Sequence, residues 1–344
     1  MNNAIKYSVA VALLISATLI AISIGTVSVP IIDIVKIIGR EGLHLPIGYD
    51  VEEKYISIVY DIRLPRVLLA GFVGASLAIS GAAFQGLLRN PLAEPYLLGV
   101  SSGASLGAVA TIFFGLSLPV IGNYTLPLFS ICCAFLTMVF VLYFAKKIDQ
   151  AMRVETIILT GIIFSSFLAS FISLIIALTG DELQQIIGWL LGSVSMRGWR
   201  YVAIILPFFI IGSVLLMMNT KELNAMSLGE ERAQHLGVDV ARKRLLILIA
   251  GSTLTGAAVA VSGMIGFVGL VIPHLVRKLW GPDHVHLLPL SMLIGAAFLI
   301  LTDLVSRTVI SPQVLPVGVI TALIGAPVFA VILLRQKRES RGEG

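Results

Sequence analysis

Long apolar runs alternate with short polar connections along the whole chain. A helix needs about 20 mostly apolar residues to cross roughly 30 Å of hydrocarbon. Ten runs approach that length: 7–25, 67–88, 97–115, 126–145, 157–179, 201–218, 245–261, 264–279, 287–305 and 314–334. None shows the alternating segments of about ten residues that are typical of a transmembrane barrel. The pattern predicts an all-α polytopic membrane protein, with ten transmembrane helices in a single domain over residues 1–344.

Composition supports lipid as the surrounding solvent, because 57% of the 344 residues are hydrophobic and only 12% are charged. Soluble chains carry roughly a quarter charged residues. Lys6 is the only basic residue before the first run, and no small-residue cleavage site follows the run. We therefore expect this run to be a retained helix and not a removed signal peptide.

The distribution of Lys and Arg predicts the orientation. If ten helices cross and the N-terminus is cytoplasmic, about two thirds of the 24 basic residues lie in inside segments, as the positive-inside rule requires. We expect a multi-pass protein of the cell (inner or cytoplasmic) membrane with both termini cytoplasmic. The net charge of +5 then comes from basic residues that set this orientation and does not indicate a nucleic-acid-binding face. Residues about 26–62 are then extracellular and about 221–244 cytoplasmic. In the outer segment, Asp33, Lys36 and Arg40 recur at helical spacing and predict an interfacial helix with its polar edge to water.

Ionisable groups that could drive transport or catalysis are scarce. The only acidic residue inside the ten runs is Asp303, whereas ion-coupled carriers hold such groups at membrane depth. No Gly-Lys pair exists to complete a nucleotide phosphate cradle. Cys132 and Cys133 are adjacent in a span and are interpreted as apolar filler, and His284 and His286 are expected in a solvated turn. We predict a non-catalytic chain with no metal site and no bound cofactor.

One compact charged segment interrupts this apolar pattern. "SLGEERAQHLGVDVARKR" (227–244) holds seven charged residues and a histidine within eighteen positions. Ser227 followed by Glu230 fits a capping box, and Gly237 stands where a glycine would end a helix. The sequence predicts a short cytoplasmic helix over 227–237. It suits a docking site for a partner, and an ordinary amphipathic connector is the alternative.

Four long motifs carry a family resemblance: "RLPRVLLAGFVGASLAISGAAFQGLLRNPLAEPYLLGVSSGASLGA" (63–108), "LGEERAQHLGV" (228–238), "SGMIGFVGLVIPHLVRKLWGPDH" (262–284) and "LPVGVITALIGAPVFAVILLR" (315–335). The chain resembles the permease subunits of type II ABC importers for iron chelates, haem and cobalamin. That resemblance implies the type II permease fold and a second permease copy, most simply in a homodimer. It also implies two separate ATP-binding subunits that carry ATP-Mg, and an extracellular or periplasmic substrate-binding protein.

The resemblance also implies residue roles. The segment that would seat in the ATP-binding subunit and couple it to the permease consists of Ser227, Leu228, Gly229, Glu230, Glu231, Arg232, Gln234, His235, Leu236 and Gly237. Arginines that would meet acidic residues of the binding protein are Arg63, Arg66 and Arg307, for which snorkelling at the interface, or pairing of Arg307 with Asp303 one turn away, is the alternative.

A gate to the cytoplasm is implied at Asn90 and Leu92, in "RNPLAEP", where an irregular loop is the simpler interpretation. In "GVSSGASLG", Gly99, Gly103 and Gly107 predict close helix packing.

The fifth run carries several hydroxyl side chains that can bond the preceding turn's carbonyls, which suits a conduit for a bulky ligand. We expect import of a bulky metal chelate, with ferric siderophore or haem first and cobalamin as the alternative, and we disfavour an ion-coupled secondary transporter.

Overall fold

The computed structural model describes residues 2–25, 27–42, 44–45, 52–119 and 122–340, and this part of the chain is helical without any strand. The α-helices are α1 (Asn3–Ser23), α2 (Ile31–Ile37), α3 (Glu53–Ile56), α4 (Leu64–Leu87), α5 (Val100–Phe113), α6 (Thr125–Ile148), α7 (Val154–Leu178), α8 (Leu183–Leu190), α9 (Gly198–Met217), α10 (Thr220–Ser227), α11 (Glu230–His235), α12 (Val240–Ser262), α13 (Val268–Trp280), α14 (His284–Thr308) and α15 (Val317–Ser340). The predicted all-helical class is confirmed.

Each of the ten predicted runs contains a helix. Within the described residues, seven helices are long and apolar enough to cross a membrane: α1, Glu53–Leu87 (α4 with its extension), α6, α7, α9, α12 and α14. Two shorter apolar helices, Val100–Phe113 and Val317–Ile332, fall below that length, and α13 has 13 residues. A multi-pass membrane protein is therefore confirmed, and a crossing by all ten helices stays a prediction.

Backbone breaks explain why two predicted spans are short. Helix α5 begins only after Gly99, whose φ of 70° stops the preceding 3₁₀ turn. Helix α13 begins at Val268 and not near residue 264 as predicted, because Gly263 and Phe267 take φ values of 73° and 67°. At 1.5 Å per residue, α5 spans about 21 Å, less than the roughly 30 Å of a hydrocarbon core.

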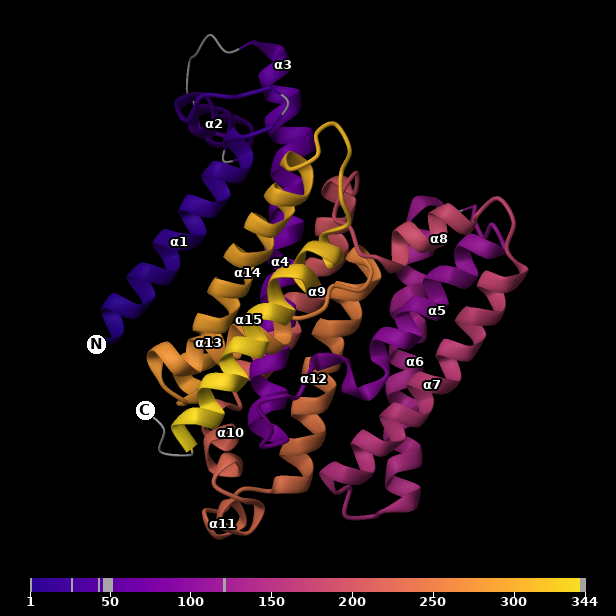
Figure 1. Cartoon of the computed structure of the whole chain (residues 1–344), viewed down its shortest axis with the longest axis vertical. Helices are drawn as coiled ribbons and strands as arrows, with labels where there is room; N and C mark the ends of the chain where they lie inside the picture. The colour runs from indigo at the N-terminus through magenta and orange to yellow at the C-terminus, as the bar shows by residue number, and fades with distance from the viewer. Residues whose placement is uncertain (1, 26, 43, 46–51, 120–121, 341–344) are drawn as a thin grey trace.

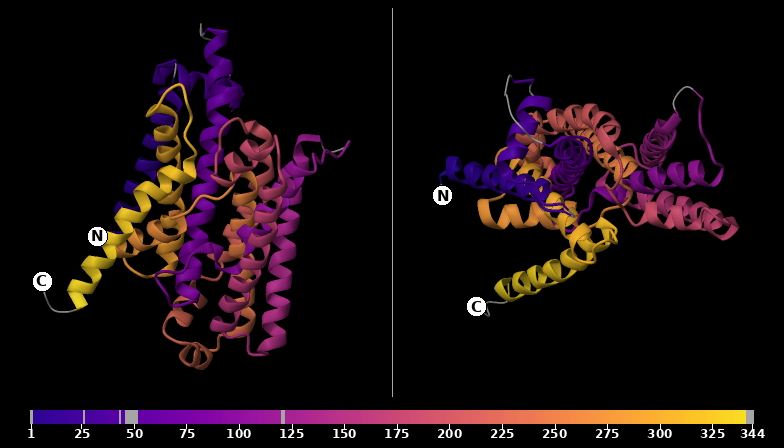
Figure 2. Two further views of the ribbon diagram at one scale, coloured as in Figure 1. Left: turned by 45° about the vertical axis from the view of Figure 1, so that its right-hand side comes forward. Right: turned by 90° about the horizontal axis from the view of Figure 1, so that it is seen from above.

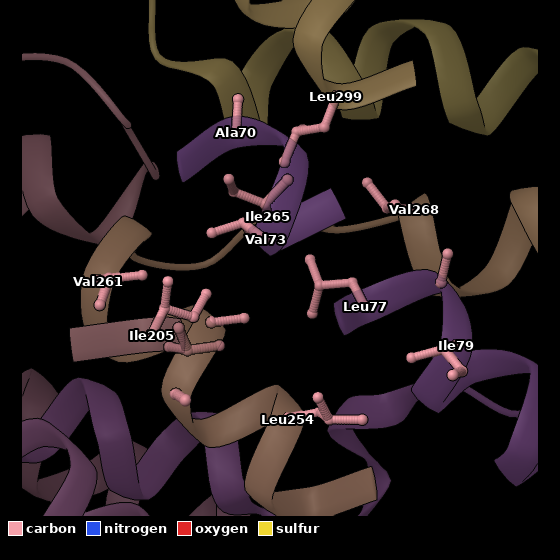
Figure 3. Packing of buried hydrophobic residues seen from close by; sticks show 14 of the residues in the cluster. Ala70, Val73, Leu77, Ile79, Ile205, Leu254, Val261, Ile265, Val268 and Leu299 are labelled. Atoms are coloured by element: carbon pink, nitrogen blue, oxygen red, sulfur yellow. The ribbon is translucent and has the colours of Figure 1, made fainter. Parts of the chain in front are cut away.

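Helix α4 forms the centre of the bundle (Figure 1), and nearly all of its residues are buried. It packs against α9, α12, α13 and α14. Glycines permit these close crossings: a Cβ on Gly81 would lie 1.9 Å from the Gly269 carbonyl oxygen, and one on Gly74 would lie 2.3 Å from that of Gly295. Small residues are the usual means of close helix packing in membranes. Branched apolar side chains of α4, α9 and α12 fill the space between them (Figure 3).

The remaining helices form two groups around this centre. Helices α5, α6 and α7 pack on one another and reach the centre through α12, while α1 lies along α14. The last helix, α15, leans away from the bundle (Figure 2) and makes its main contacts with α13 and α14. Large apolar side chains on α7 and α15, among them Leu178 and Leu323, are exposed. These two helices therefore offer apolar surface to lipid or to another chain.

The predicted interfacial helix of the outer segment is present as α2 and a π-helical turn, Ile38–Gly42. Its predicted polar edge is right only at Arg40, which is exposed. Asp33 and Lys36 are half-buried, while the apolar Ile31, Ile32 and Val35 are exposed. The end of the same segment is also helical, since α3 and the π-helical turn Ser57–Arg63 extend α4 at its N-terminus.

Candidate functional site

The charged segment forms a projection at one end of the molecule, made of α10, α11 and the turn between them (Figure 1). Most of the residues assigned to the coupling segment are exposed, namely Ser227, Leu228, Glu230, Glu231, Arg232, Gln234, His235, Leu236 and Gly237. Two of these, Leu228 and Leu236, are apolar and expose 58% and 67% of their surface. Exposed leucines at a polar tip outside the spans are typical of a contact surface for a partner.

The capping box predicted for this helix is wrong. Ser227 is the last residue of α10, and its hydroxyl donates to the Asn224 carbonyl 2.7 Å away. Gly229 is the N-cap of α11 instead, with a φ of 119°. The predicted end is confirmed: Gly237 takes a φ of 82°, its N–H donates to the Gln234 carbonyl, and the Val238 N–H donates to the Ala233 carbonyl, in a Schellman motif.

Arg244 braces the projection from the first turn of α12. Its side chain is 3% exposed and pairs with the Glu230 carboxylate at the start of α11. A second guanidinium nitrogen donates to the Met152 carbonyl, at 2.5 Å, in the connection between α6 and α7. One arginine thus links the tip, the helix that leads into the membrane and the α5–α7 group.

A second brace holds α10. Lys243 pairs with Glu222 at 2.8 Å and donates to the Asn219 side-chain carbonyl at 2.8 Å. Burial raises the pKa of Glu222, but the hydrogen bond from Lys243 and the nearby positive charge outweigh burial, and the net effect lowers that pKa. The carboxylate therefore stays ionised at neutral pH, and the projection is attached to α12 by two adjacent basic residues.

These braces were missed in the sequence. The signal is present in "VARKRLL", which begins α12 with three basic residues, but from the sequence such residues indicate only orientation. Nothing in the spacing says which of the three turns inward, and burial separates them: Arg244 is buried whereas Arg242 is exposed.

A carboxylate paired with two arginines lies near the C-terminal end of α14, at the end of the molecule remote from the projection. Asp303, 1% exposed, accepts from Arg66 Nε at 2.9 Å and from Arg66 Nη2 at 2.9 Å, a forked arrangement. Arg66 also donates to Ser195 Oγ at 3.1 Å. Arg307 lies 3.8 Å from the same carboxylate, so the predicted i,i+4 pair is confirmed.

Arg63 and Arg307 both hold the C-terminal end of α1. The Arg63 guanidinium donates to the Ile22 and Ser23 carbonyls at 2.7 and 3.1 Å, and Arg307 donates to the Ile24 carbonyl at 3.0 Å. These carbonyls belong to the last turn of α1, where no helical partner remains for them. The structure thus brings the three predicted docking arginines together, each engaged within the chain, and their docking role stays a prediction.

The predicted gate residues lie in the turn that follows α4. Asn90 and Leu92 are both exposed, and the Asn90 side-chain oxygen accepts from the Leu92 N–H at 2.9 Å. Such an Asx turn explains the irregular loop by local bonding. A gating role stays a prediction.

Predicted packing of small and hydroxyl residues is largely confirmed. A Cβ on Gly103 or Gly107 would clash with α6, at 2.1 Å from Thr137 Oγ1 and 2.7 Å from the Phe129 carbonyl oxygen. Gly99 lies outside the helix and faces α7 instead. In α7 the hydroxyls of Thr160 and Ser170 donate to carbonyls four residues earlier, at 2.7 and 3.0 Å, as in the predicted pattern.

The histidine expectation is wrong at one position. His284 is 4% exposed, and its Nδ1 lies 2.7 Å from the Asn224 side-chain oxygen in α10. It is therefore a buried contact between α14 and the projection, not part of a solvated turn. In the part of the chain that the structure describes, no group of three or more His, Cys, Asp or Glu could hold a metal ion.

The bundle of long apolar helices with a braced polar projection is that of a polytopic membrane protein. Residues 13–335 match the model of the FecCD transport family. The chain belongs to that family, whose relatives are permeases of ABC importers.

Three relatives illustrate the range of that family. An uncharacterised ABC transporter permease of Bacillus subtilis, YvrB, is 57% identical over 99% of this chain and 96% of its own length. The cobalamin import permease BtuC of Halobacterium salinarum is 42% identical over 84% of this chain and 76% of its own. The Fe(3+) dicitrate permease FecD of Escherichia coli is 39% identical over 83% of this chain and 87% of its own length.

The fold has a solved counterpart. A metal-chelate type ABC transporter in an inward-facing conformation is 34% identical, covers 97% of this chain and 100% of its own, and superposes with a TM-score of 0.84. The molybdate permease MolB of Haemophilus influenzae is also similar, at 37% identity over 96% of each chain. Similar folds in this family therefore serve chemically different cargoes.

Proposed function

We propose that this chain is the permease subunit of an ATP-driven importer for a bulky metal chelate, ferric siderophore or haem in the first place. Two copies enclose one path, two ATP-binding subunits carry ATP-Mg and drive it, and an extracellular or periplasmic binding protein delivers the ligand. The observation that carries the proposal is the projection formed by α10 and α11, exposed at its tip and braced at its base.

The coupling role follows from how the projection is attached. A short helix held by ion pairs to the start of α12 moves with α12 as one body, and a packed interface transmits such a movement into the membrane. Leu228 and Leu236 supply exposed apolar contact area at the tip. No nucleotide-binding motif is present in the chain, so the ATP-binding subunits are separate proteins in this proposal.

Cobalamin is the second candidate cargo. It is supported by the similarity to the Halobacterium salinarum permease, while the iron-dicitrate permease and the metal-chelate transporter support an iron chelate. The hydroxyls of Thr160 and Ser170 in α7 bond carbonyls of the same helix, so they offer weak contacts to a passing ligand. Such a surface supports specificity that resides mainly in the binding protein.

The exposed apolar surfaces of α7 and α15 support a second copy of the chain beside this one, in a homodimer. The basic residues support an orientation with the projection and both termini in the cytoplasm. The cluster of Arg63, Arg66 and Arg307 then lies at the extracellular end of the bundle, where Arg66 lines a cavity of about 340 Å³ together with Asp61 and Arg197.

Charge reversal of Arg63, Arg66 or Arg307 to glutamate is expected to weaken binding of the cognate binding protein by about ten-fold, with a loss of salt dependence. Binding would be measured on permease in nanodiscs at low and high ionic strength. Lys146→Glu, at the cytoplasmic end of α6, is the matched charge control. Affinity that is indifferent to both reversal and salt contradicts docking at these arginines, and equal membrane levels of each variant exclude a folding defect.

The proposal as a whole is tested by uptake in vesicles. With its ATP-binding subunits and binding protein, the permease should accumulate a ferric siderophore, haem or cobalamin only when ATP is supplied, and an ionophore should leave that uptake unchanged. Uptake by the permease alone, or uptake abolished by the ionophore at constant ATP, contradicts it. Comparison of the three ligands in the same vesicles identifies the cargo.

A further inference from the structure

A second cavity opens at the same end of the bundle as the cluster of Arg63, Arg66 and Arg307. Its volume is about 760 Å³, and it is bounded by the end of α5, the start of α6, α8 and the start of α9. The wall at the start of α9 carries five large side chains, those of Met196, Arg197, Trp199, Arg200 and Tyr201. None of the described residues that line the cavity is acidic. Two positive charges and two aromatic rings therefore share one wall that holds no counter-charge.

Arg197 is held in position but keeps one nitrogen available to a partner. Its guanidinium lies over the Tyr201 ring, 4.9 Å from the centroid, and its Nη1 donates to the Tyr201 hydroxyl at 3.2 Å. Within the described residues, its Nη2 has no hydrogen-bond partner and, unlike its Nε, is not buried. A guanidinium stacked on an aromatic ring loses little freedom when a carboxylate binds it.

Arg200 is the more accessible of the two arginines. It is exposed in the first turn of α9, and its guanidinium lies 5.9 Å from the centroid of the Tyr124 ring, just before α6. In the part of the chain that the structure describes, this guanidinium makes no hydrogen bond or ion pair. Between the two arginines, Trp199 Nε1 donates to the Tyr60 carbonyl at 3.0 Å and fixes the start of α9 to the segment before α4. Both arginines thus stand on a rigid support.

The turn before α9 presents a methionine to the exterior. Met196 is 100% exposed and has a φ of 55°, a conformation that glycine adopts more easily. Met196, Arg197 and Gly198 line this cavity and also the smaller cavity of about 340 Å³ that Arg66 lines. The turn therefore separates two cavities and projects between them. Because its side chain packs on nothing within the chain, Met196 is placed for contact with a partner, and methionine is enriched at such contacts.

The cluster of Arg63, Arg66 and Arg307 offers much less surface. Arg63 is 5% exposed, and the side chains of Arg66 and Arg307 are 14% and 10% exposed. Arg66 Nη1 donates to Ser195 Oγ, directly before Met196. The cluster therefore supports the turn from within the bundle, while the basic groups that a partner can reach are those of Arg197 and Arg200.

From these observations we propose that Met196, Arg197 and Arg200 form a docking surface for an acidic face of the binding protein. This inference rests on the proposed function, which supplies the binding protein and the orientation. Carboxylates of the partner pair with Arg197 Nη2 and with Arg200, and the methionine enters an apolar recess between them. Arginine beside Trp and Tyr is the composition of an energetically dominant contact. A second copy of the chain fits this surface poorly, because a symmetric contact would bring the same positive charges together.

The first test measures affinity, on permease in nanodiscs, for the binding protein that supports uptake by the wild type in vesicles. Arg197→Glu and Arg200→Glu should each weaken binding by at least about ten-fold and reduce its salt dependence. Met196→Gly should weaken it by about five-fold. Since glycine suits the backbone at 196 and Arg200 is exposed, the thermal midpoints of these two variants should match that of the wild type. Lys146→Glu, an exposed charge at the end of α6, should bind as the wild type does.

The second test follows oxidation of methionine by hydrogen peroxide, read by mass spectrometry on the wild-type permease in nanodiscs. The binding protein should slow oxidation of Met196 by at least about five-fold. It should leave unchanged that of Met218, which is 71% exposed at the other end of α9.

Wild-type affinity in all three variants, or equal oxidation of Met196 with and without the binding protein, overturns the proposal. Slow oxidation of Met196 before the binding protein is added also overturns it, because a second copy or lipid then covers this surface. If no binding protein supports uptake by the wild type, the proposed function fails as well. Binding that is normal in the wild type and in every variant removes this surface alone.

Discussion

Replacing Glu230 by arginine is expected to abolish ATP-driven uptake while the protein still inserts into the membrane. The new guanidinium would face Arg244, which is 3% exposed and has Glu230 as its ion-pair partner. Because Glu230 is itself half-exposed, loss of the pair costs less than the roughly 3–5 kcal/mol of a fully buried pair, but a like charge beside the buried Arg244 adds to that cost. Because the cost falls at the junction of α11 and α12, the tip separates from the span while the bundle stays folded. Uptake into vesicles with all partner subunits is the measurement.

Two further variants show whether the ion pair matters or merely the charge of the tip. Glu231→Arg makes the same change one residue away, at an exposed side chain, and should retain most of the uptake. Glu230→Gln keeps a hydrogen-bond acceptor for Arg244, and since Glu230 is itself 46% exposed, we expect only a partial loss. Full uptake in Glu230→Arg, or equal loss in Glu231→Arg, contradicts the coupling assigned to this pair.

The helices could be predicted from the sequence because each depends on a local property, the length of an apolar run. All ten runs contain a helix, whereas their limits depend on backbone breaks that composition does not reveal. Phe267 shows the difficulty: nothing about a phenylalanine predicts a φ of 67°, yet this residue helps to end the irregular segment before α13. The short helices α5 and α13 are for this reason two of the places where a crossing remains a prediction. The third is the apolar part of α15, Val317–Ile332.

The site was predictable where its residues are contiguous and not where they meet across the fold. The projection could be predicted from a charged segment of eighteen residues. The contacts that fix the two sites join residues far apart in the sequence. His284 contacts Asn224, 60 positions earlier, and Arg63 caps carbonyls about 40 positions earlier. A pattern at helical spacing can suggest Asp303 and Arg307 as a pair, but it cannot reveal that Arg66 binds the same carboxylate.

Asp303→Asn is expected to destabilise the folded permease by about 3–5 kcal/mol, the largest stability effect of any single change at the outer cluster. The carboxylate is 1% exposed, and the side chains of Arg66 and Arg307 that face it are 14% and 10% exposed. Removing its charge leaves two guanidinium groups close together with little access to water. Thermal unfolding of the purified variant in detergent, compared with the wild type, measures the effect.

Two companion variants show that charge balance is the cause. Asp61→Asn removes a carboxylate from an exposed position nearby and should change stability little. The double variant Asp303→Asn with Arg66→Gln leaves a neutral pair in place of the strongest contact, so its loss should be clearly smaller than the sum of the two single losses. Strictly additive losses would mean that Asp303 stabilises the outer end by something other than its pairing with Arg66. In that case the carboxylate would no longer explain how these arginines are held in the positions that the proposed docking requires.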